Sequence, residues 1–366
     1  MEYKKINELT TVVTGGTPST RKNEYWDNGD IPWLQSGCCQ NCDVDSTEKY
    51  ITKEGYNNSS THMMSADTVM IALTGATAGK VGYLKFEACG NQSITGILPC
   101  ESLNQRYLFF YLLSQREKIL ADCVGGAQAH ISQSYVKNMT IPILAIKEQE
   151  QIVGELTKVS NIVSLRQEEI QQLDNLVKAR FVEMFGDCTN MISLSELCLI
   201  ITDGTHQSPK FQHDGIPFIL VSNLSKNTVT YDTDKFISAE TYKELYKRTP
   251  IEIGDILLST VGSYGHPAVV VEDRKFLFQR HIAYLKPKSD ILNSYYMHGA
   301  LLSPGCQRQI EEKVKGIAQK TLNLSEIRKI RIPVSSLDLQ KQYADFVHQV
   351  NKSKVAVQKA LDETQI

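Results

Sequence analysis

The stretch TGATAGKVG, residues 74–82, brings glycines and a lysine together, as phosphate-binding loops do. Such a loop needs four residues between its two glycines and a Ser or Thr directly after its lysine. Here three residues separate Gly75 from Gly79, and Val81 follows Lys80. The stretch therefore predicts a glycine-rich turn between two strands, in which Lys80 could still contact a phosphate group.

Cys39 and Cys42 have the spacing of zinc ligands, but a structural zinc site needs four. No second CxxC or HxxxH motif lies nearby, although His62, Cys89 and Cys100 could complete a set. The second half of the chain has no corresponding cluster. We therefore predict no metal site.

Catalytic motifs are also weak. Asp290, Glu311 and Lys313 fit a metal-assisted nuclease only loosely, because the last two fall in a helical pattern. No Pro-Pro pair exists to build the Asn/Asp-Pro-Pro-Tyr motif of a methyltransferase, and no Ser–His–Asp arrangement stands out. These observations give no support for an enzyme.

The chain consists of two copies of one pattern. GDIPWLQSG (29–37) matches DGIPFILVS (214–222), and ADTVMIALTGATAGKVGYL (66–84) matches GDILLSTVGSYGHPAVVV (254–271). GNQSITGIL (90–98) matches FQRHIAYLK (278–286), which aligns Gln92 with Gln279, and GGAQAHIS (125–132) matches KGIAQKTLN (315–323). Because the matches keep one order, the chain is a tandem duplication. The second glycine turn, TVGSYGHPA, has no equivalent of Lys80.

Each copy ends in a polar segment with a heptad stripe, which predicts a long amphipathic helix. The stripe of the first copy is formed by Ile152, Leu156, Val159, Val163, Ile170, Leu173 and Val177. The stripe of the second is formed by Tyr343, Val347, Val350, Val357 and Leu361, with Lys354 as its weak point. We expect the two helices to pack antiparallel along these stripes.

Composition sets the broad class. The 366 residues are 42% hydrophobic and 22% charged, which is typical of a globular chain long enough for two domains. A formal net charge of −2 argues against a free-standing, non-specific nucleic-acid binder, although partners or a local basic face could contact phosphates. No apolar run reaches the roughly 20 residues of a membrane span. We expect a cytoplasmic protein whose nine cysteines are reduced and mostly buried.

The predicted fold class is α+β, with two pseudo-symmetric globular domains separated by two long antiparallel coiled-coil helices. The expected boundaries are 1–146 for the first domain, 147–187 for its helix, 188–336 for the second domain and 337–366 for its helix. Residues 66–98 and 254–286 read as short strands with glycine-rich turns. Residues 104–122 and 292–315 read as helical, with a kink at Pro304.

This order of motifs resembles the specificity subunits of type I restriction–modification enzymes. The resemblance rests on GGTPST…YWDNGDIPWLQSG, LTGATAGKVG, GGAQAHIS, TIPIL…KEQEQIV and FVEMFGD (181–187), and it covers nearly the whole chain. It implies two target-recognition domains, each reading one part of a split double-stranded DNA sequence, and helices that dock two methyltransferase subunits. The partners would bind S-adenosylmethionine, motor–nuclease subunits would be optional, and this chain would be non-catalytic.

The chain departs from the family pattern in one respect. A second copy of FVEMFGD would fall beyond Ile366, so we expect a shorter second helix. This leaves open an alternative, in which the chain is a non-catalytic scaffold or antagonist that binds methyltransferase subunits without productive DNA reading.

Candidates for DNA contact are polar and cationic side chains in turn-like segments, because base edges and phosphates bind such groups. In the first half they are Thr17, Ser19, Arg21, Lys22, Gln35, Ser36, Thr77, Lys80, Gln128 and His130. In the second half they are His206, Gln207, Lys210, Ser222, Asn223, Tyr264, His266, Arg280, Gln319 and Lys320. Gln128 and Gln319 align with each other, and either DNA contact or a structural hydrogen bond would explain them. For Trp33 and Phe218 we expect core packing.

Overall fold

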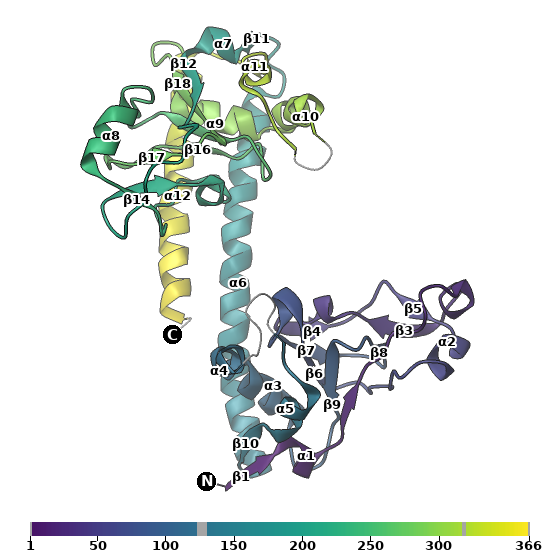
Figure 1. Cartoon of the computed structure of the whole chain (residues 1–366). Coiled ribbons are helices and arrows are strands. Elements are labelled where there is room, and N and C mark those ends of the chain that lie inside the picture. The colour runs from purple at the N-terminus through teal and green to yellow at the C-terminus, as the bar shows by residue number, and fades with distance from the viewer. Residues whose placement is uncertain (1, 123–129, 317–319, 365–366) are drawn as a thin grey trace. The chain divides into compact units, whose positions relative to one another are not determined.

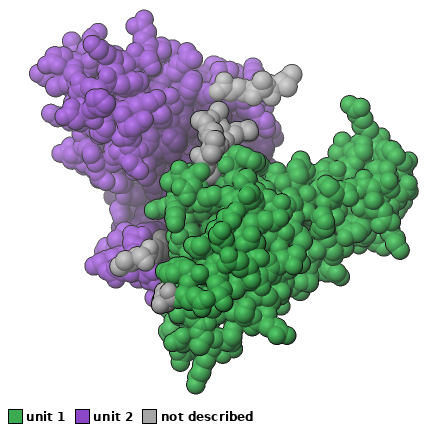
Figure 2. All heavy atoms as spheres, turned by 60° about the horizontal axis from the view of Figure 1, so that its bottom comes forward, with its two compact units in different colours: residues 1–162 green, residues 163–366 purple. Residues whose placement is uncertain are grey.

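The computed structural model describes residues 2–122, 130–316 and 320–364 (Figure 1). It divides into two compact units, residues 1–162 and 163–366, which Figure 2 colours separately. Each unit combines small sheets with helices, so the predicted α+β class is confirmed. Across the described residues, no helix is both long and apolar enough to span a membrane.

The three central strands of the main sheet of unit 1 are short runs whose residues are buried on both faces. Its strand order is β2 (Val12–Thr14), β9 (Ile94–Ile97), β6 (Val69–Ala72), β7 (Val81–Leu84) and β4 (Cys42–Val44), and only the β4–β7 pair is parallel. A second sheet joins β5 (Tyr50–Ile51), β3 (Ile31–Leu34) and β8 (Cys89–Gly90), and a third joins β1 (Glu2–Lys5) and β10 (Thr140–Ile143). The helices of the unit are α1 (Ile6–Leu9), α2 (Lys53–Asn57), α3 (Gln105–Ser114), α4 (Arg116–Ala121) and α5 (Gln133–Asn138).

Unit 2 repeats this plan without a counterpart of β4 among its described residues. Its main sheet has the order β12 (Cys198–Asp203), β18 (Ile282–Pro287), β15 (Ile256–Ser259) and β16 (Pro267–Val269). The smaller sheets join β14 (Phe236–Ile237), β13 (Ile216–Ile219) and β17 (Leu277–Phe278), and β11 (Met191–Ser193) with β19 (Arg331–Pro333). The helices are α7 (Leu194–Leu197), α8 (Ala239–Tyr246), α9 (Ser294–Leu302), α10 (Pro304–Lys313) and α11 (Leu324–Ile327).

The matching strand orders confirm the duplication. In both units the three-stranded sheet contains one parallel pair, β3–β8 in unit 1 and β13–β17 in unit 2. In both units a two-stranded sheet also pairs the strand before the first helix with the strand before the long helix: β1 with β10, and β11 with β19. The expected break at Pro304 is present, since α10 begins there and the Ser303 side chain accepts a hydrogen bond from the Cys306 N–H.

One detail of the predicted alignment is wrong. The Asn91 N–H donates to the carbonyl of Leu34 in unit 1, and the Gln279 N–H donates to the carbonyl of Ile219 in unit 2. Asn91 is therefore the counterpart of Gln279, and the counterpart of Gln92 is Arg280. Position by position, the matched strings 90–98 and 278–286 give this same register, so pairing the two glutamines shifted the alignment by one residue in favour of residue identity.

The glycine-rich turns adopt the conformation that their composition predicts. Gly75 and Gly79 in unit 1 have φ angles of 73° and 74°, and Gly262 and Gly265 in unit 2 have φ angles of 71° and 81°. Side chains with a Cβ atom rarely adopt this left-handed region, so glycine suits all four positions. The turns connect β6 to β7 and β15 to β16, as expected for strand connections.

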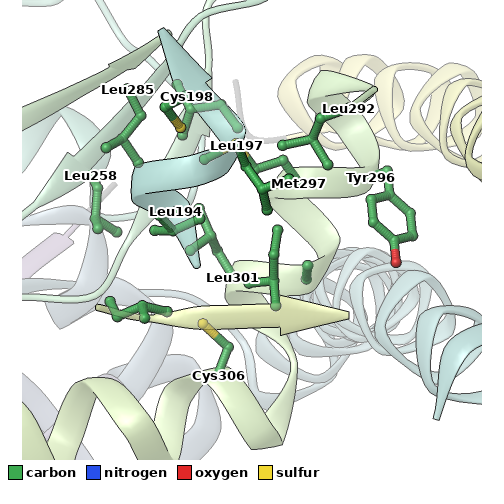
Figure 3. Close-up of a cluster of buried hydrophobic side chains, with 14 of the residues drawn as sticks. Leu194, Leu197, Cys198, Leu258, Leu285, Leu292, Tyr296, Met297, Leu301 and Cys306 are labelled. Atoms are coloured by element: carbon green, nitrogen blue, oxygen red, sulfur yellow. The ribbon is translucent and has the colours of Figure 1, made fainter. Parts of the chain in front are cut away.

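The core of unit 2 lies between its main sheet and α7, α9 and α10. Figure 3 shows Leu194 and Leu197 of α7 facing Met297 and Leu301 of α9, with the sheet beside them. Cys306 also belongs to this cluster, and burial raises the pKa of its thiol to about 12. Such a thiol stays neutral and acts as an apolar side chain.

The cysteines only partly follow expectation. All eight that the structure describes are free thiols. Four of them are buried, whereas we expected most to be: Cys39, Cys89, Cys198 and Cys306. The others lie in loops and at strand edges, where sequence alone gives little indication of burial.

The long helices predicted after each domain are α6 (Ile146–Phe185) and α12 (Leu337–Thr364). In unit 2 the C-terminal part of α6 and α12 run in opposite directions (Figure 1), as the heptad stripes predicted. The Tyr343 ring contacts the rings of Phe181 and Phe185, and its hydroxyl donates to the carbonyl of Val177 over 3.4 Å. The stripe of α12 is buried at Tyr343, Val347, Val350, Val357 and Leu361. On α6 the stripe residues Val163, Ile170, Leu173 and Val177 are half-buried.

Two other stripe residues differ from the prediction. Leu156 and Val159 of unit 1 remain 39% and 41% exposed, while Ile152 packs against the core of unit 1. A heptad stripe shows which face of a helix can be buried but not how far its partner extends. Because α12 has 28 residues and α6 has 40, the stripe of α6 is the longer one.

Candidate nucleic-acid interface

In both units, most candidate residues gather at one edge of the main sheet. In unit 1 this edge is where β2 and β6 end and where β9 and β7 begin. In unit 2 it is where β12 and β15 end and where β18 and β16 begin. We call these two places the unit 1 edge and the unit 2 edge. Loops that leave a sheet at one edge bring residues from distant sequence positions together, which suits recognition of an extended ligand.

Short polar contacts link the loops of the unit 1 edge. The Thr17 hydroxyl donates to Oε1 of Gln92 over 2.5 Å, and the Thr74 hydroxyl donates to the Ser93 hydroxyl over 2.9 Å. Thr74 also pairs through its backbone with His130. The structure thus brings together Thr17, Thr77 and His130, which lie far apart in the sequence.

Gln35 and Lys80 lie on neighbouring parts of the same edge. Gln35 directly follows Leu34, whose carbonyl accepts the Asn91 N–H over 2.8 Å, so it adjoins the segment that carries Gln92. The Lys80 ammonium donates to Oε1 of Gln40 over 2.6 Å, which holds its charge beside the glycine turn. Lys80 is half-buried, and Ser36 begins the short 3₁₀ turn of residues 36–38.

Arg21, Lys22 and Ser19 lie in the exposed loop after β2. The Lys22 ammonium donates to the Tyr25 hydroxyl over 2.9 Å and lies 3.5 Å from a carboxylate oxygen of Glu24. Lys22 is therefore already paired, whereas Arg21 forms no ion pair or hydrogen bond with the described residues. A DNA phosphate would meet Arg21 without first displacing a protein carboxylate.

Arg280 and His281 form the centre of the unit 2 edge. The Arg280 Nε donates to the His281 Nε2 over 3.2 Å. Burial lowers the pKa of His281, and the charge of Arg280 lowers it further. A neutral imidazole accepts at one nitrogen and donates at the other, which is the state that this hydrogen bond requires.

Two hollows flank this pair, and both are lined by Arg280 and His281. One, of about 320 Å³, is also lined by Thr205, His206 and Lys235, and no carboxylate lines it. The other, of about 290 Å³, is also lined by Asp203, Thr260, Val261 and the 321–324 segment. Their walls therefore offer cations, hydroxyls and an imidazole, which are the groups that contact phosphates and base edges.

Asp203 is the acidic group nearest to this cluster. Its carboxylate lies 2.6 Å from an Nη of Arg248 and 3.0 Å from the imidazole of His206. The guanidinium of Arg248 therefore offsets the charge of Asp203, which reduces its repulsion of a polyanion.

Some candidates of unit 2 have structural roles. Asn223 is buried: its Oδ1 accepts the Leu220 N–H, and its amide nitrogen donates to Thr230 and to the carbonyl of Asp232. We therefore withdraw Asn223 as a base-reading residue. The sequence correctly indicated a turn at Asn223. It could not show whether the asparagine side chain binds the turn backbone or a DNA base, because asparagines in both roles occur in similar polar sequences.

The remaining candidates of unit 2 differ in exposure. His266 is half-buried and its Nδ1 pairs with Oδ1 of Asn227 at 3.0 Å, while the Lys320 ammonium lies 5.9 Å from the centre of the Tyr264 ring. The exposed ones are Gln207, Lys210, Ser222 and Lys320. Gln128 and Gln319, the matched pair of the repeat, lie outside the described residues.

Several edge residues were missed by the sequence reading. They are Ser93 and Gln92 in unit 1, and Thr205, Lys235 and His281 in unit 2. The repeat contained a signal for the 91–93 and 279–281 segments, because both directly precede a matched buried strand.

Trp33 and Phe218 occupy matched positions in β3 and β13, and both are buried, with exposures of 3% and 2%. The Trp33 indole N–H donates to the carbonyl of Gly16 over 3.0 Å. The predicted core role of both residues is confirmed. As for metals, the described residues contain no group of three His, Cys, Asp or Glu side chains placed to hold one.

Comparisons with known proteins place this geometry in context. The sequence profile of the type I restriction modification DNA specificity domain matches residues 1–175 and 189–364. The specificity subunit of a type I restriction enzyme from Escherichia coli is 32% identical over 169 residues, which is 45% of this chain and 42% of that protein. The chain thus aligns with less than half of that relative.

Two further likenesses extend over the whole chain. A type I restriction enzyme specificity subunit from Methanocaldococcus jannaschii is 22% identical over 388 residues, 98% of this chain and 89% of that protein. The crystal structure of a type I restriction–modification S subunit from M. genitalium matches with a TM-score of 0.52 and 16% identity, over 100% of this chain and 92% of that one. At this identity the likeness supports the two-domain fold.

Proposed function

The chain belongs to the type I restriction–modification DNA specificity family, and from this premise we propose that each of its two units reads one part of a split, asymmetric double-stranded DNA target. One observation carries the proposal: the same sheet edge in both units carries exposed polar and cationic side chains, and these side chains differ between the units. Gln92 and Ser93 stand in unit 1 where Arg280 and His281 stand in unit 2. Different side chains on equivalent scaffolds favour different half-sites.

The net charge of −2 fits a subunit of a larger complex. A chain without a strong positive charge gains little from counterion release, so partners would supply many phosphate contacts. We propose that α6 and α12 dock two methyltransferase subunits and that motor–nuclease subunits join in some assemblies. The methyltransferase partners would bind S-adenosylmethionine and carry out methyl transfer in the cytoplasm, while this chain remains non-catalytic.

The test is reconstitution of the chain with its cognate methyltransferase subunit. Mapping methylated adenines in host DNA, with and without the gene for this chain, gives the target. The mapped sequence is then placed in a short duplex for retardation on a gel. We expect specific retardation of a duplex that carries both half-sites, and weaker binding when either half-site is scrambled.

The same experiment distinguishes the scaffold alternative. A complex that forms but retards all duplexes equally would show that the chain assembles methyltransferase subunits without reading DNA. Methylation at a continuous palindrome would contradict a split, asymmetric target. The duplex with both half-sites scrambled measures the non-specific binding, and all comparisons are made at one salt concentration.

A further inference from the structure

Gln92 and Arg280 occupy the same position in the two copies of the fold, at the start of the segment that leads into β9 and β18. The backbone beside them is held in the same way. The Ser93 carbonyl accepts the Leu73 N–H over 2.8 Å, and the His281 carbonyl accepts the Thr260 N–H over 3.0 Å. Two different side chains are thus presented from equivalent, fixed backbones.

Arg280 is exposed, and a single hydrogen bond, made through Nε, orients its guanidinium group. Its Nε donates to His281, and among the described residues neither Nη group has a hydrogen-bond partner. The Nη groups are therefore free to donate to a ligand, and the two hollows beside the pair leave room for it. A planar group that is already oriented loses less conformational entropy on binding.

Gln92 is also exposed and also held from one side. Its Oε1 accepts from the Thr17 hydroxyl over 2.5 Å, and its Nε2 has no hydrogen-bond partner within the described ranges. Because an amide oxygen has two lone pairs, Oε1 can accept a second hydrogen bond while Nε2 donates. Gln92 can therefore present one acceptor and one donor side by side.

These two arrangements fit different bases. A guanidinium donates twice to O6 and N7 of guanine, whereas a glutamine amide accepts from N6 and donates to N7 of adenine. We infer that Gln92 and Arg280 are matched specificity-determining residues, with Gln92 selecting adenine in the half-site read by unit 1 and Arg280 selecting guanine in the half-site read by unit 2. His281 acts as a positioning residue for Arg280. The inference rests on the proposed function and adds the bases and the residues that select them.

The test uses the full complex of this chain with its methyltransferase subunit in the host. Adenine methylation is mapped for the wild type and for the variants R280Q, R280K and Q92R. With R280Q we expect one guanine position in one half-site to accept adenine, and with R280K we expect weaker selection of guanine, because lysine lacks the planar fork. The loss of guanine discrimination in R280Q should be roughly tenfold to hundredfold, while the other half-site stays unchanged. With Q92R we expect a change at one adenine position of the opposite half-site.

Arg274→Gln is the matched control, because Arg274 is exposed, follows the far end of β16 and contacts the Tyr231 ring. It should leave the methylated sequence unchanged. Melting temperatures of all variants should equal that of the wild type, since the side chains of Gln92 and Arg280 are exposed. Failure of the wild-type complex to methylate any split sequence would overturn the proposed function and with it this inference. An intact wild-type target that none of the three edge variants alters would overturn the inference alone.

The role of His281 has its own readout. His281→Leu removes the acceptor for Arg280, and His281→Gln keeps an acceptor at a similar position. We expect degeneracy at the same guanine position with H281L and recovery of discrimination with H281Q. A purely structural role would instead lower the melting temperature of H281L without changing the bases methylated, and that result would remove His281 from the mechanism.

Discussion

The side-chain carbonyl of Gln149 accepts a hydrogen bond of 2.8 Å from the backbone N–H of Asn104. Gln149 lies in the first turn of α6 and is fully buried, and its amide nitrogen donates to the carbonyls of Ser102 and Leu144. Asn104 in turn caps α3 with its own side chain. One glutamine thus fastens the start of a long helix to the loop before another helix of the same unit.

The same arrangement is present in unit 2. There Gln340, in the first turn of α12, accepts the Asn293 N–H over 2.8 Å and donates to the carbonyls of Ile291 and Ser335. Asn293 caps α9, as Asn104 caps α3. Because both copies keep every partner, each long helix leaves its own unit in the same fixed way.

We predict that Gln149→Ala lowers the free energy of unfolding by about 1–3 kcal/mol, because it leaves the half-buried Asn104 N–H without a partner. Gln340→Ala should have a similar effect in unit 2. Gln151→Ala is the control: Gln151 is exposed on the same helix, and the same gain in helix propensity should leave stability within about 0.5 kcal/mol. Urea unfolding followed by circular dichroism measures all three. Equal stability of Q149A and Q151A would contradict the anchoring role.

Lys354 interrupts the apolar stripe of α12, and its ammonium lies 2.6 Å from a carboxylate oxygen of Asp174 on α6. The Asp174 side chain is 44% exposed, so solvent weakens the pair. We predict that Lys354→Leu raises stability by up to about 1 kcal/mol, because an apolar side chain completes the stripe. The matched control Lys352→Leu, at an exposed position, should give no gain.

The ion pair between Lys354 and Asp174 also limits how α6 and α12 can align, since the two charges meet in only one register of the helices. Cysteine cross-linking of facing positions on α6 and α12 should therefore give one product in the wild type and more than one in K354L. A single product in both proteins would show that packing alone sets the register.

His298 of α9 offers a pH-dependent readout of unit 2. Its Nε2 lies 3.1 Å from the carbonyls of both Asn227 and Pro267, and burial lowers the pKa of the imidazole. These two carbonyls raise the pKa, but less than burial lowers it. The folded protein therefore holds His298 neutral at a pH where the unfolded chain takes up a proton.

A depressed folded pKa contributes stability that is present above the unfolded value of about 6.5 and is lost as pH falls through the folded value. We predict that the free energy of unfolding decreases from pH 7 toward pH 5 and that His298→Gln makes this decrease smaller. The charge of Lys354 lowers the pKa of His298 and that of Asp174 raises it, so Lys354→Leu should also reduce the pH dependence. An identical pH slope in wild type and H298Q would contradict the assignment.

The sequence predicted the repeat, the long helices and the glycine turns because each depends on local patterns. A heptad stripe, a duplicated motif and a left-handed glycine are properties of a few neighbouring residues. The exposure of Leu156 and the burial of Asn223 depend instead on contacts with distant parts of the chain. No spacing rule gives these contacts.

The sequence indicated a candidate region more clearly than a set of residues. Turn residues beside matched strands lie at one edge of the main sheet in each unit, since strand order follows from the repeat. Sequence alone does not distinguish a polar side chain that faces a ligand from one that caps a turn, because Asn, Ser and Thr are common in both roles. The positions of His281 and Gln92 at the two edges follow from the backbone hydrogen bonds that fix the register of the two copies.

The continuous helix α6 provides the last prediction. It is anchored in unit 1 by Gln149 and in unit 2 by Phe181 and Phe185, which lie in the core of that unit. Seven residues inserted after Ser160 would lengthen the helix by about 10.5 Å and keep its faces within about 20°. All stripe residues from Val163 onward would keep their contacts with α12.

If α6 sets the gap between the half-sites, this insertion should lengthen the tolerated gap by about three base pairs, at about 3.4 Å per base pair. The bases read within each half-site should stay the same, because both edges are untouched. Methylation mapping of the reconstituted complex measures both quantities at once, with Ser160→Ala as the control for disturbance of the helix surface. A change in the bases read with an unchanged gap would show that α6 does not act as the spacer, since bases are selected at the edges and the gap by the length of the helix.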